Sequence, residues 1–263
     1  MDILVKEQIL RLEKDLHTHT TYSDGRNTME EMVQNAIKSG KKVYGISDHS
    51  YTFFDESYCM MKDKYEAYKE EAKRLKEKYK DEIDFKIGIE QDYYSEESTD
   101  GFDYVIGSAH YIKIDGEYFE VDGANVSIVD DLLKLIDEKF DGDAYKFVEC
   151  YFNNVADVVR KTNCDIIGHF DLVTKYNEQK PFFDENDERY VKIWKKAVDS
   201  LIPYGKPFEI NLAAYRKGLR KEPYPSLAIQ KYIKEKGGSF VFSSDSHLID
   251  ALFADYDETK ILG

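Results

Sequence analysis

Short apolar segments recur along the chain and predict its strands. They are rich in Val, Ile, Phe and Tyr, and they are apolar on both alternations rather than on every second residue. This pattern is typical of parallel strands that are buried on both faces. The predicted strands are Glu13–His17, Val43–Ser47, Phe85–Ile89, Tyr104–Ser108, Asp165–Gly168, Pro207–Asn211 and Ser239–Ser243.

Longer segments with helical periodicity separate these strands. Between Met61 and Lys80 an apolar stripe repeats every three or four residues, as in a helix that packs on one face. The same stripe runs through Tyr145–Val159 and Val191–Leu201, and Thr28–Glu31 has the form of a capping box that begins a further helix. The alternation predicts an α/β fold with a parallel sheet, and the number of strands favours a closed or nearly closed barrel in one domain, residues 1–263.

Composition narrows the classes of protein that fit this pattern. The 263 residues include 52 acidic and 37 basic side chains, so the net charge is −15, which disfavours binding of nucleic acid through a broad basic face. The 21 tyrosines and 15 phenylalanines provide enough apolar area to make disorder unlikely as the main state. Charged residues interrupt the first segment, residues 2–13, so we expect no signal peptide and no membrane span.

The cysteines indicate a compartment. Cys59, Cys150 and Cys164 are too few and too scattered for a disulfide framework or a zinc knuckle. We therefore expect free thiols and a cytoplasmic location.

The histidines carry the strongest functional signal. Each one falls at or just after the carboxyl end of a predicted strand, where Glu90 and Asp245 also lie. A single histidine near a strand end is more often structural, but barrels of βα units carry their active sites at this face. The joint placement predicts that these side chains meet. The six histidines are His17, His19, His49, His110, His169 and His247.

Imidazoles combined with carboxylates predict a transition-metal centre. This donor set suits Zn²⁺, Mn²⁺ or Fe²⁺ and is too rich in nitrogen for Ca²⁺ or Mg²⁺. The donors exceed what one tetrahedral ion needs and would suffice for two or three ions. Glu90 is a natural bridge between ions because a carboxylate has two oxygens.

This series of motifs resembles the PHP (polymerase and histidinol phosphatase) superfamily. The matching motifs are Asp15-Leu-His17-Thr-His19-Thr, Ser23-Asp24-Gly25, Ser47-Asp48-His49, Glu90, His110, His169 and Asp245-Ser-His247. The resemblance implies a distorted, TIM-like (β/α)₇ barrel with a site for three divalent transition-metal ions. It implies that the first ion is held by His17, His19, Glu90 and Asp245, the second by Glu90, His110 and His169, and the third by Asp24, His49 and His247.

Within the superfamily the chain is similar to the branch of histidinol-phosphate phosphatases. The similarity lies in Gly107–Ile112, Gly168–Leu172, Glu209–Lys217 and Tyr224–Ser226. In that branch an Arg after the Glu-x-Asn stretch and a Ser after the Tyr-Pro help to hold the phosphate. This implies phosphate binding by Arg216 and Ser226, although the intervening Leu-Ala-Ala-Tyr departs from the small residues and glycine that are common in the branch.

The resemblance also implies a reaction. L-histidinol phosphate would be hydrolysed to L-histidinol and phosphate, a step of histidine biosynthesis, by attack of a hydroxide that bridges two metal ions. It implies catalytic roles for Glu90, Asp245, His247 and Arg216, and contact of His49 with the substrate.

Residues next to the predicted ligands provide candidate supporting contacts. Asp15, Asp48 and Asp171 are candidates to accept the second N–H of a metal-bound imidazole, although Asp15 and Asp48 fit structural hydrogen bonds equally well. The aromatic segment Tyr51–Phe54 fits either a wall of the substrate pocket or ordinary loop packing. Of the basic residues beyond Arg216, we expect Arg220 and Lys221 to lie in a solvated loop.

Two other functions remain open from the sequence. One is a PHP phosphoesterase with a different substrate, such as a nucleotide, which would keep the metal ligands and change only the pocket. The other is a non-catalytic, metal-stabilised module. We expect a small phosphate ester as the partner, with no nucleic acid and no membrane; the native metal and the oligomeric state stay open.

Overall fold

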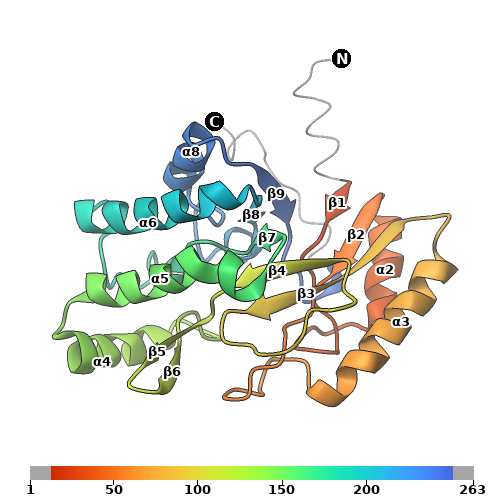
Figure 1. The fold of residues 1–263 in the computed structure, drawn as a ribbon, viewed down its shortest axis with the longest axis horizontal. Helices are drawn as coiled ribbons and strands as arrows, with labels where there is room; N and C mark the ends of the chain where they lie inside the picture. The colour runs from red at the N-terminus through yellow and green to blue at the C-terminus, as the bar shows by residue number, and fades with distance from the viewer. Residues whose placement is uncertain (1–12, 251–263) are drawn as a thin grey trace.

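Seven parallel strands form the centre of the molecule (Figure 1). The computed structural model describes residues 13–250, so the expectation for the first segment lies largely outside the described residues. The strands follow one another around the sheet in the order β1-β2-β3-β4-β7-β8-β9. They are β1 Lys14–Asp15, β2 Val43–Ile46, β3 Asp84–Asp92, β4 Tyr104–Ser108, β7 Ile166–Ile167, β8 Phe208–Asn211 and β9 Phe240–Ser243.

The first and last strands approach each other and nearly close the sheet. Beyond their carboxyl ends, Thr18 and Ser246 form an isolated parallel bridge, and the His19 N–H donates to the Ser246 carbonyl at 2.9 Å. The Ser244 N–H also donates to Asp15 Oδ1 at 3.1 Å. The predicted barrel is therefore confirmed, and its closure lies at the end where the histidines leave the strands.

Helices cover the outside of the barrel, as the periodicity predicts. Figure 1 shows α2 and α3 on one side and α4, α5, α6 and α8 on the other. The predicted capping box is present, because Thr28 Oγ1 accepts from the Glu31 N–H while Glu31 accepts from the Thr28 N–H. The helices are α2 Met29–Lys38, α3 Tyr65–Lys78, α4 Ile128–Phe140, α5 Ala144–Thr162, α6 Glu188–Leu201, α7 Ala213–Arg216 and α8 Leu227–Glu235, with short 3₁₀ turns at Lys62–Lys64, Leu172–Thr174 and Ile202–Tyr204.

Apolar helix stripes pack on the strands and form the core. The α5 stripe is buried through Phe147, Tyr151 and Phe152. Inside the barrel the packing is tight: a Cβ on Gly88 would lie 2.3 Å from the ring of Tyr104, whose hydroxyl donates to the Leu16 carbonyl. Glycine is therefore required where these two strands meet.

One element was not predicted from the sequence. Residues Tyr111–Ile114 (β5) and Glu117–Glu120 (β6) form an antiparallel hairpin directly after His110. Its turn places Asp115 and Gly116 at φ 53° and 92°, which is the geometry that Asp-Gly favours in a two-residue hairpin turn. The hairpin stands outside the barrel sheet, next to the candidate site.

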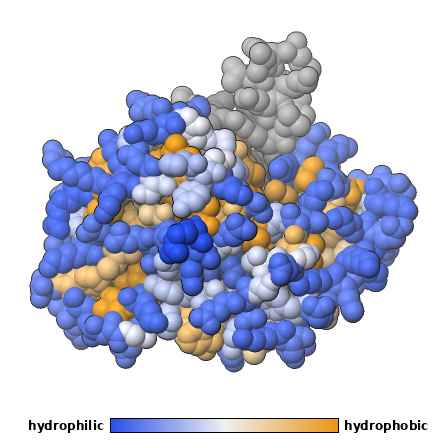
Figure 2. Space-filling view, in the orientation of Figure 1, coloured by the Kyte–Doolittle hydropathy of each residue, from blue (hydrophilic) through white to orange (hydrophobic). Residues whose placement is uncertain are grey.

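The surface agrees with the charge of the chain. Hydrophilic residues dominate the face in Figure 2, and the hydrophobic residues appear there as small, separate areas. Among the described residues, none of the helices is both long enough and apolar enough to pass through a bilayer.

Candidate metal centre

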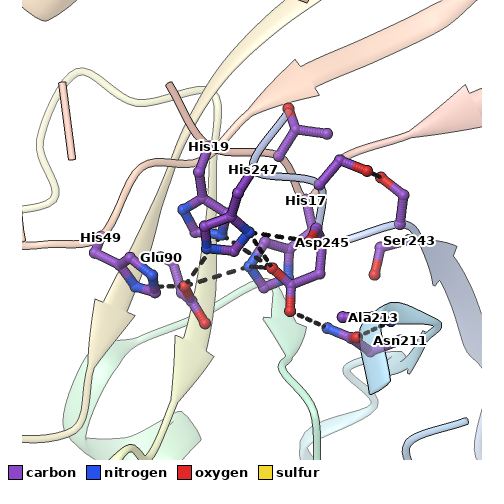
Figure 3. Close-up of polar contacts among 12 residues, drawn as sticks. His17, His19, His49, Glu90, Asn211, Ala213, Ser243, Asp245 and His247 are labelled. Carbon is purple, nitrogen blue, oxygen red and sulfur yellow. Dashed lines mark hydrogen bonds and ion pairs between the residues drawn. The ribbon is translucent and has the colours of Figure 1, made fainter. Parts of the chain in front are cut away.

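The carboxyl ends of the strands bring the predicted ligands together. His17 and His19 follow β1, His49 follows β2, and His110 and His169 come two residues after β4 and β7. Asp245 and His247 follow β9. Glu90 does not end its strand as predicted, because β3 continues to Asp92 and holds the carboxylate inside the sheet. Figure 3 shows side chains from β3 and from the segments after β1, β2 and β9 turned toward one another.

Glu90 lies at the centre of the cluster and is 1% exposed. Its Oε2 lies 3.3 Å from His17 Nε2, 3.7 Å from His19 Nε2 and 2.7 Å from His49 Nδ1. Its Oε1 lies 2.9 Å from His169 Nε2 and 3.5 Å from His110 Nε2. Each oxygen therefore faces a different set of imidazoles, which is the arrangement that a bridging carboxylate needs.

Asp245 completes the set around His17 and His19. Its Oδ1 lies 3.2 Å from His19 Nε2 and 3.8 Å from His17 Nε2. The residue has a φ of 48°, a left-handed conformation that is costly for a non-glycine residue and recurs at functional sites. Asn211 fixes the carboxylate by donating from Nδ2 to Oδ2 at 3.0 Å.

A further set gathers around Asp24. Its carboxylate oxygens lie 3.2 Å from His247 Nε2, 3.7 Å from His49 Nε2 and 3.9 Å from His19 Nδ1. Burial raises the pKa of Asp24, but the His49 and His247 imidazoles outweigh it and hold the pKa well below its usual range. Asp24 therefore belongs to the cluster, although it lies in an exposed turn.

The side chains of this cluster fit metal ions. Buried donor atoms that make no hydrogen bond include His17 Nε2 and both ring nitrogens of His19. Burial and the neighbouring His247 and His49 lower the pKa of His19 to about 3, so this ring is neutral near pH 7 and its lone pair is available. Three sets have ligand atoms within 4.8 Å of one another: His19, Asp24, His49 and His247; His17, His19 and Asp245; and His49, Glu90 and His110.

Two buried carboxylates that we did not predict orient these imidazoles. Glu209 Oε1 accepts from His17 Nδ1 at 2.5 Å, and Asp92 Oδ2 lies 3.2 Å from His110 Nδ1. In both rings Nε2 is then left to face Glu90, as expected for a metal ligand whose other nitrogen donates to a carboxylate. A signal for Glu209 was present in the sequence, because a charged residue inside a buried strand needs a partner.

The predicted supporting aspartates have other roles. Asp48 accepts from the backbone and hydroxyl of Thr20 and from Ser23, and Asp15 accepts from backbone N–H groups. Asp171 accepts from the Ser226 N–H at 3.0 Å. No hydrogen bond between these three carboxylates and an imidazole occurs within residues 13–250. The structural interpretation is therefore the better one for Asp15 and Asp48, and the predicted contact of Asp171 with an imidazole is absent among these residues.

The predicted phosphate contacts lie in two different places. Arg216 donates from Nη1 to the Ser244 carbonyl at 3.2 Å and to Ser246 Oγ at 3.0 Å. Its two acceptors therefore belong to the residues that precede and follow Asp245 in the chain. Ser226 lines a cleft of about 830 Å³ that none of the predicted metal ligands lines. Arg216 is therefore bonded to the two chain neighbours of Asp245, whereas Ser226 lines a separate cleft.

The structure contradicts the predicted solvated position of Arg220. It is 5% exposed, and it donates to both carboxylate oxygens of Glu185 at 2.9 and 2.8 Å and to the Thr174 carbonyl. Burial of the Arg220 guanidinium is possible because the Glu185 carboxylate neutralises its positive charge. Arg220 therefore stabilises the loop after β8.

An aromatic group borders the cluster. The Tyr58 ring lies 4.9 Å from His49 and 6.1 Å from His110, measured between ring centroids. Within the segment Tyr51–Phe54, Phe54 packs 4.9 Å from Tyr111 of the hairpin. The sequence identified the segment but not Tyr58, whose ring packs next to the predicted ligands His49 and His110.

Comparisons with known proteins agree with this site. A curated relative from Schizosaccharomyces pombe, named "Probable histidinol-phosphatase", is 26% identical over 250 residues, which cover 83% of this chain and 74% of the relative. A Listeria monocytogenes structure described as a candidate histidinol phosphatase has a TM-score of 0.77 at 20% identity and covers 93% of this chain and 98% of its own.

A Lactococcus lactis histidinol phosphate phosphatase, crystallised with zinc, L-histidinol and phosphate, has a TM-score of 0.67 at 22% identity, over 93% of this chain and 88% of that one. At these identities the two solved structures establish the shared fold. The PHP domain family model matches residues 15–213, which is most of the chain and includes all the predicted ligands except Asp245 and His247. The chain therefore belongs to the PHP domain family.

Proposed function

We propose that this chain is a metal-dependent phosphomonoesterase that hydrolyses L-histidinol phosphate to L-histidinol and phosphate in the cytoplasm. The arrangement around Glu90 carries the proposal, because its two oxygens face two different sets of imidazoles. The relatives named histidinol-phosphatase and the solved relative that holds L-histidinol and phosphate support the choice of substrate.

The donor set divides among three divalent ions of zinc, manganese or iron. We assign His17, His19, Glu90 and Asp245 to the first ion, Glu90, His110 and His169 to the second, and Asp24, His49 and His247 to the third. When bound, such ions supply Lewis-acid stabilisation of a phosphoryl group and acidify nearby water.

The protein's own residues hold this centre and orient the ester. Glu209 keeps the proton of His17 on Nδ1, so that Nε2 is free to act as a ligand. The Arg216 guanidinium is anchored by Ser244 and Ser246, the residues before and after Asp245, and its planar set of donors suits the oxygens of a phosphate. His49 and His247 form, together with Asp24, the ligand set of the third ion, and we expect the substrate to approach on this side. The proposed role of Ser226 depends on the family resemblance alone.

The test combines metal analysis with turnover. We expect the wild-type chain to bind three ions and to hydrolyse L-histidinol phosphate faster than any nucleoside monophosphate in a panel. The His17→Ala variant should bind at least one ion fewer and lose activity by about 100-fold or more, because one ligand set is incomplete.

Two results would refute the proposal. Preference for a nucleotide, with L-histidinol phosphate among the poorest substrates, would identify a PHP phosphoesterase of different specificity. A full metal load without hydrolysis of any monoester would identify a metal-stabilised module without catalysis.

A further inference from the structure

An acidic side chain lies beside the metal-ligand cluster, on the hairpin that follows His110. Strand β6 pairs with β5 so that Glu120 lies directly opposite Tyr111. Opposed residues of antiparallel strands project from the same face. Tyr111 turns toward the loop after β2, where its hydroxyl donates to Asp55 Oδ2 at 2.7 Å. Glu120 therefore faces the space between the hairpin and that loop.

Aromatic rings connect this space with the cluster. The Tyr58 ring lies 6.1 Å from Tyr111 on one side and 4.9 Å from His49 on the other, between centroids. Phe54 closes the far side through its contact with Tyr111 at 4.9 Å. An organic group attached to a phosphate at the cluster would therefore lie among rings and next to Glu120.

Two further carboxylates, Asp55 and Asp122, lie close enough to influence Glu120, and both have partners among the described residues. Asp55 accepts from Tyr111 and Ser57, and Asp122 is paired with Lys175 at 2.9 Å. The Glu120 carboxylate makes no hydrogen bond or ion pair with any residue of the described part of the chain, 13–250.

The charges around Glu120 leave this space negative. Burial and the Asp122 carboxylate raise the pKa of Glu120 to about 7, with Asp55 acting in the same direction, while Lys175 and the His110 imidazole oppose the shift. Among these groups Lys175 is the only permanent cation, and it is already paired with Asp122. A ligand that brings a positive charge next to Glu120 would therefore be stabilised.

We propose that Glu120 binds the ammonium group of the substrate and so determines a preference for phosphate monoesters that carry an amine. The inference rests on the proposed phosphomonoesterase function and adds to it how the organic part of the ester is recognised. The site would then have two ends of opposite charge: Arg216 and the metal ions for the phosphate, and Glu120 for the ammonium. A charge-assisted hydrogen bond and neighbouring aromatic faces both favour an ammonium ion. Nucleoside monophosphates carry no such group.

The test compares two esters that differ in charge. L-histidinol phosphate carries an ammonium group, and 4-nitrophenyl phosphate does not. We expect Glu120→Gln to lower kcat/KM for L-histidinol phosphate about 10- to 100-fold, mainly through KM, and to leave 4-nitrophenyl phosphate within about threefold. Glu120→Asp should restore part of the loss. Glu117→Gln, an exposed residue at the other end of β6, is the matched control and should change neither ester.

Binding gives a readout that does not depend on turnover. Calorimetry with L-histidinol on the zinc-loaded protein should show affinity reduced by a similar factor in Glu120→Gln and unchanged in Glu117→Gln. Equal losses for both esters, or no loss for either, would overturn the role of Glu120, and so would unchanged binding of L-histidinol.

A failure of the proposed function would be distinguishable. If the wild type did not hydrolyse L-histidinol phosphate, 2-aminoethyl phosphate and 2-hydroxyethyl phosphate would decide the inference, because they differ only in the amine. A preference for the amine that Glu120→Gln abolishes would support it, and equal rates would overturn it. Hydrolysis of none of these esters would overturn both proposals.

Discussion

Replacing Glu209 by Gln should weaken metal binding through His17, although Glu209 is not itself among the proposed ligands. The Glu209 carboxylate is 1% exposed and accepts four hydrogen bonds. Oε1 accepts from His17 Nδ1 and Ser243 Oγ, and Oε2 accepts from the His169 backbone N–H at 2.7 Å and from Asn211 Nδ2 at 3.1 Å. A glutamine offers one oxygen and one NH₂ group in the same place.

The orientation of that glutamine follows from its neighbours. The His169 backbone N–H can only donate, so the amide oxygen should take that side and the amide NH₂ should face His17 Nδ1 and the Ser243 hydroxyl. Ser243 can rotate its hydroxyl and accept. The His17 ring can accept only by moving its proton to Nε2, which is the nitrogen that faces Glu90 at 3.3 Å. The variant therefore places a proton where the metal would bind.

The expected magnitude is a loss of about 10- to 100-fold in zinc affinity, or about 1.4–2.7 kcal/mol. Competition with a chromophoric chelator at pH 7.5 measures it. Asp48→Asn is the matched control, because this buried carboxylate accepts from Thr20 and Ser23 and not from an imidazole. It should lower the unfolding temperature and leave zinc affinity unchanged. Zinc affinity of Glu209→Gln within threefold of the wild type would refute the reasoning.

Further predictions concern stability. Phe147→Ala should lower the free energy of unfolding in urea by about 3–5 kcal/mol, since this ring is fully buried. Gly88→Ala should cost at least about 1–3 kcal/mol by the same assay, because the added methyl group would lie 2.3 Å from the Tyr104 ring; an unchanged midpoint would contradict this. Arg220→Met should lower the melting temperature, with a loss of about 3 kcal/mol from the broken Glu185 pair. Chelation should lower the wild-type melting temperature, and added zinc should restore it.

Much of the fold could be predicted because local patterns and the barrel geometry agree. The apolar runs predicted all seven barrel strands, with differences of at most three residues at their ends and none for β4. The capping box of α2 depends on residues three positions apart, so it could be identified directly. The hairpin β5–β6 was not predicted because its strands alternate only weakly between buried and exposed positions. The dipeptide Asp115-Gly116, which is typical of a two-residue hairpin turn, could have been recognised in the sequence.

The sequence by itself identified the histidines and carboxylates that gather around Glu90. Strand ends of a βα barrel converge on one face, so the position of each histidine relative to its strand was enough to predict the cluster around Glu90. The supporting contacts could not be predicted in this way. Glu209 and His17 are 192 residues apart, and only the curvature of the barrel brings their side chains into contact. Arg220 is buried for a similar reason, since Glu185 reaches it from another loop. Side-chain partners across the barrel depend on tertiary distances that no local pattern encodes.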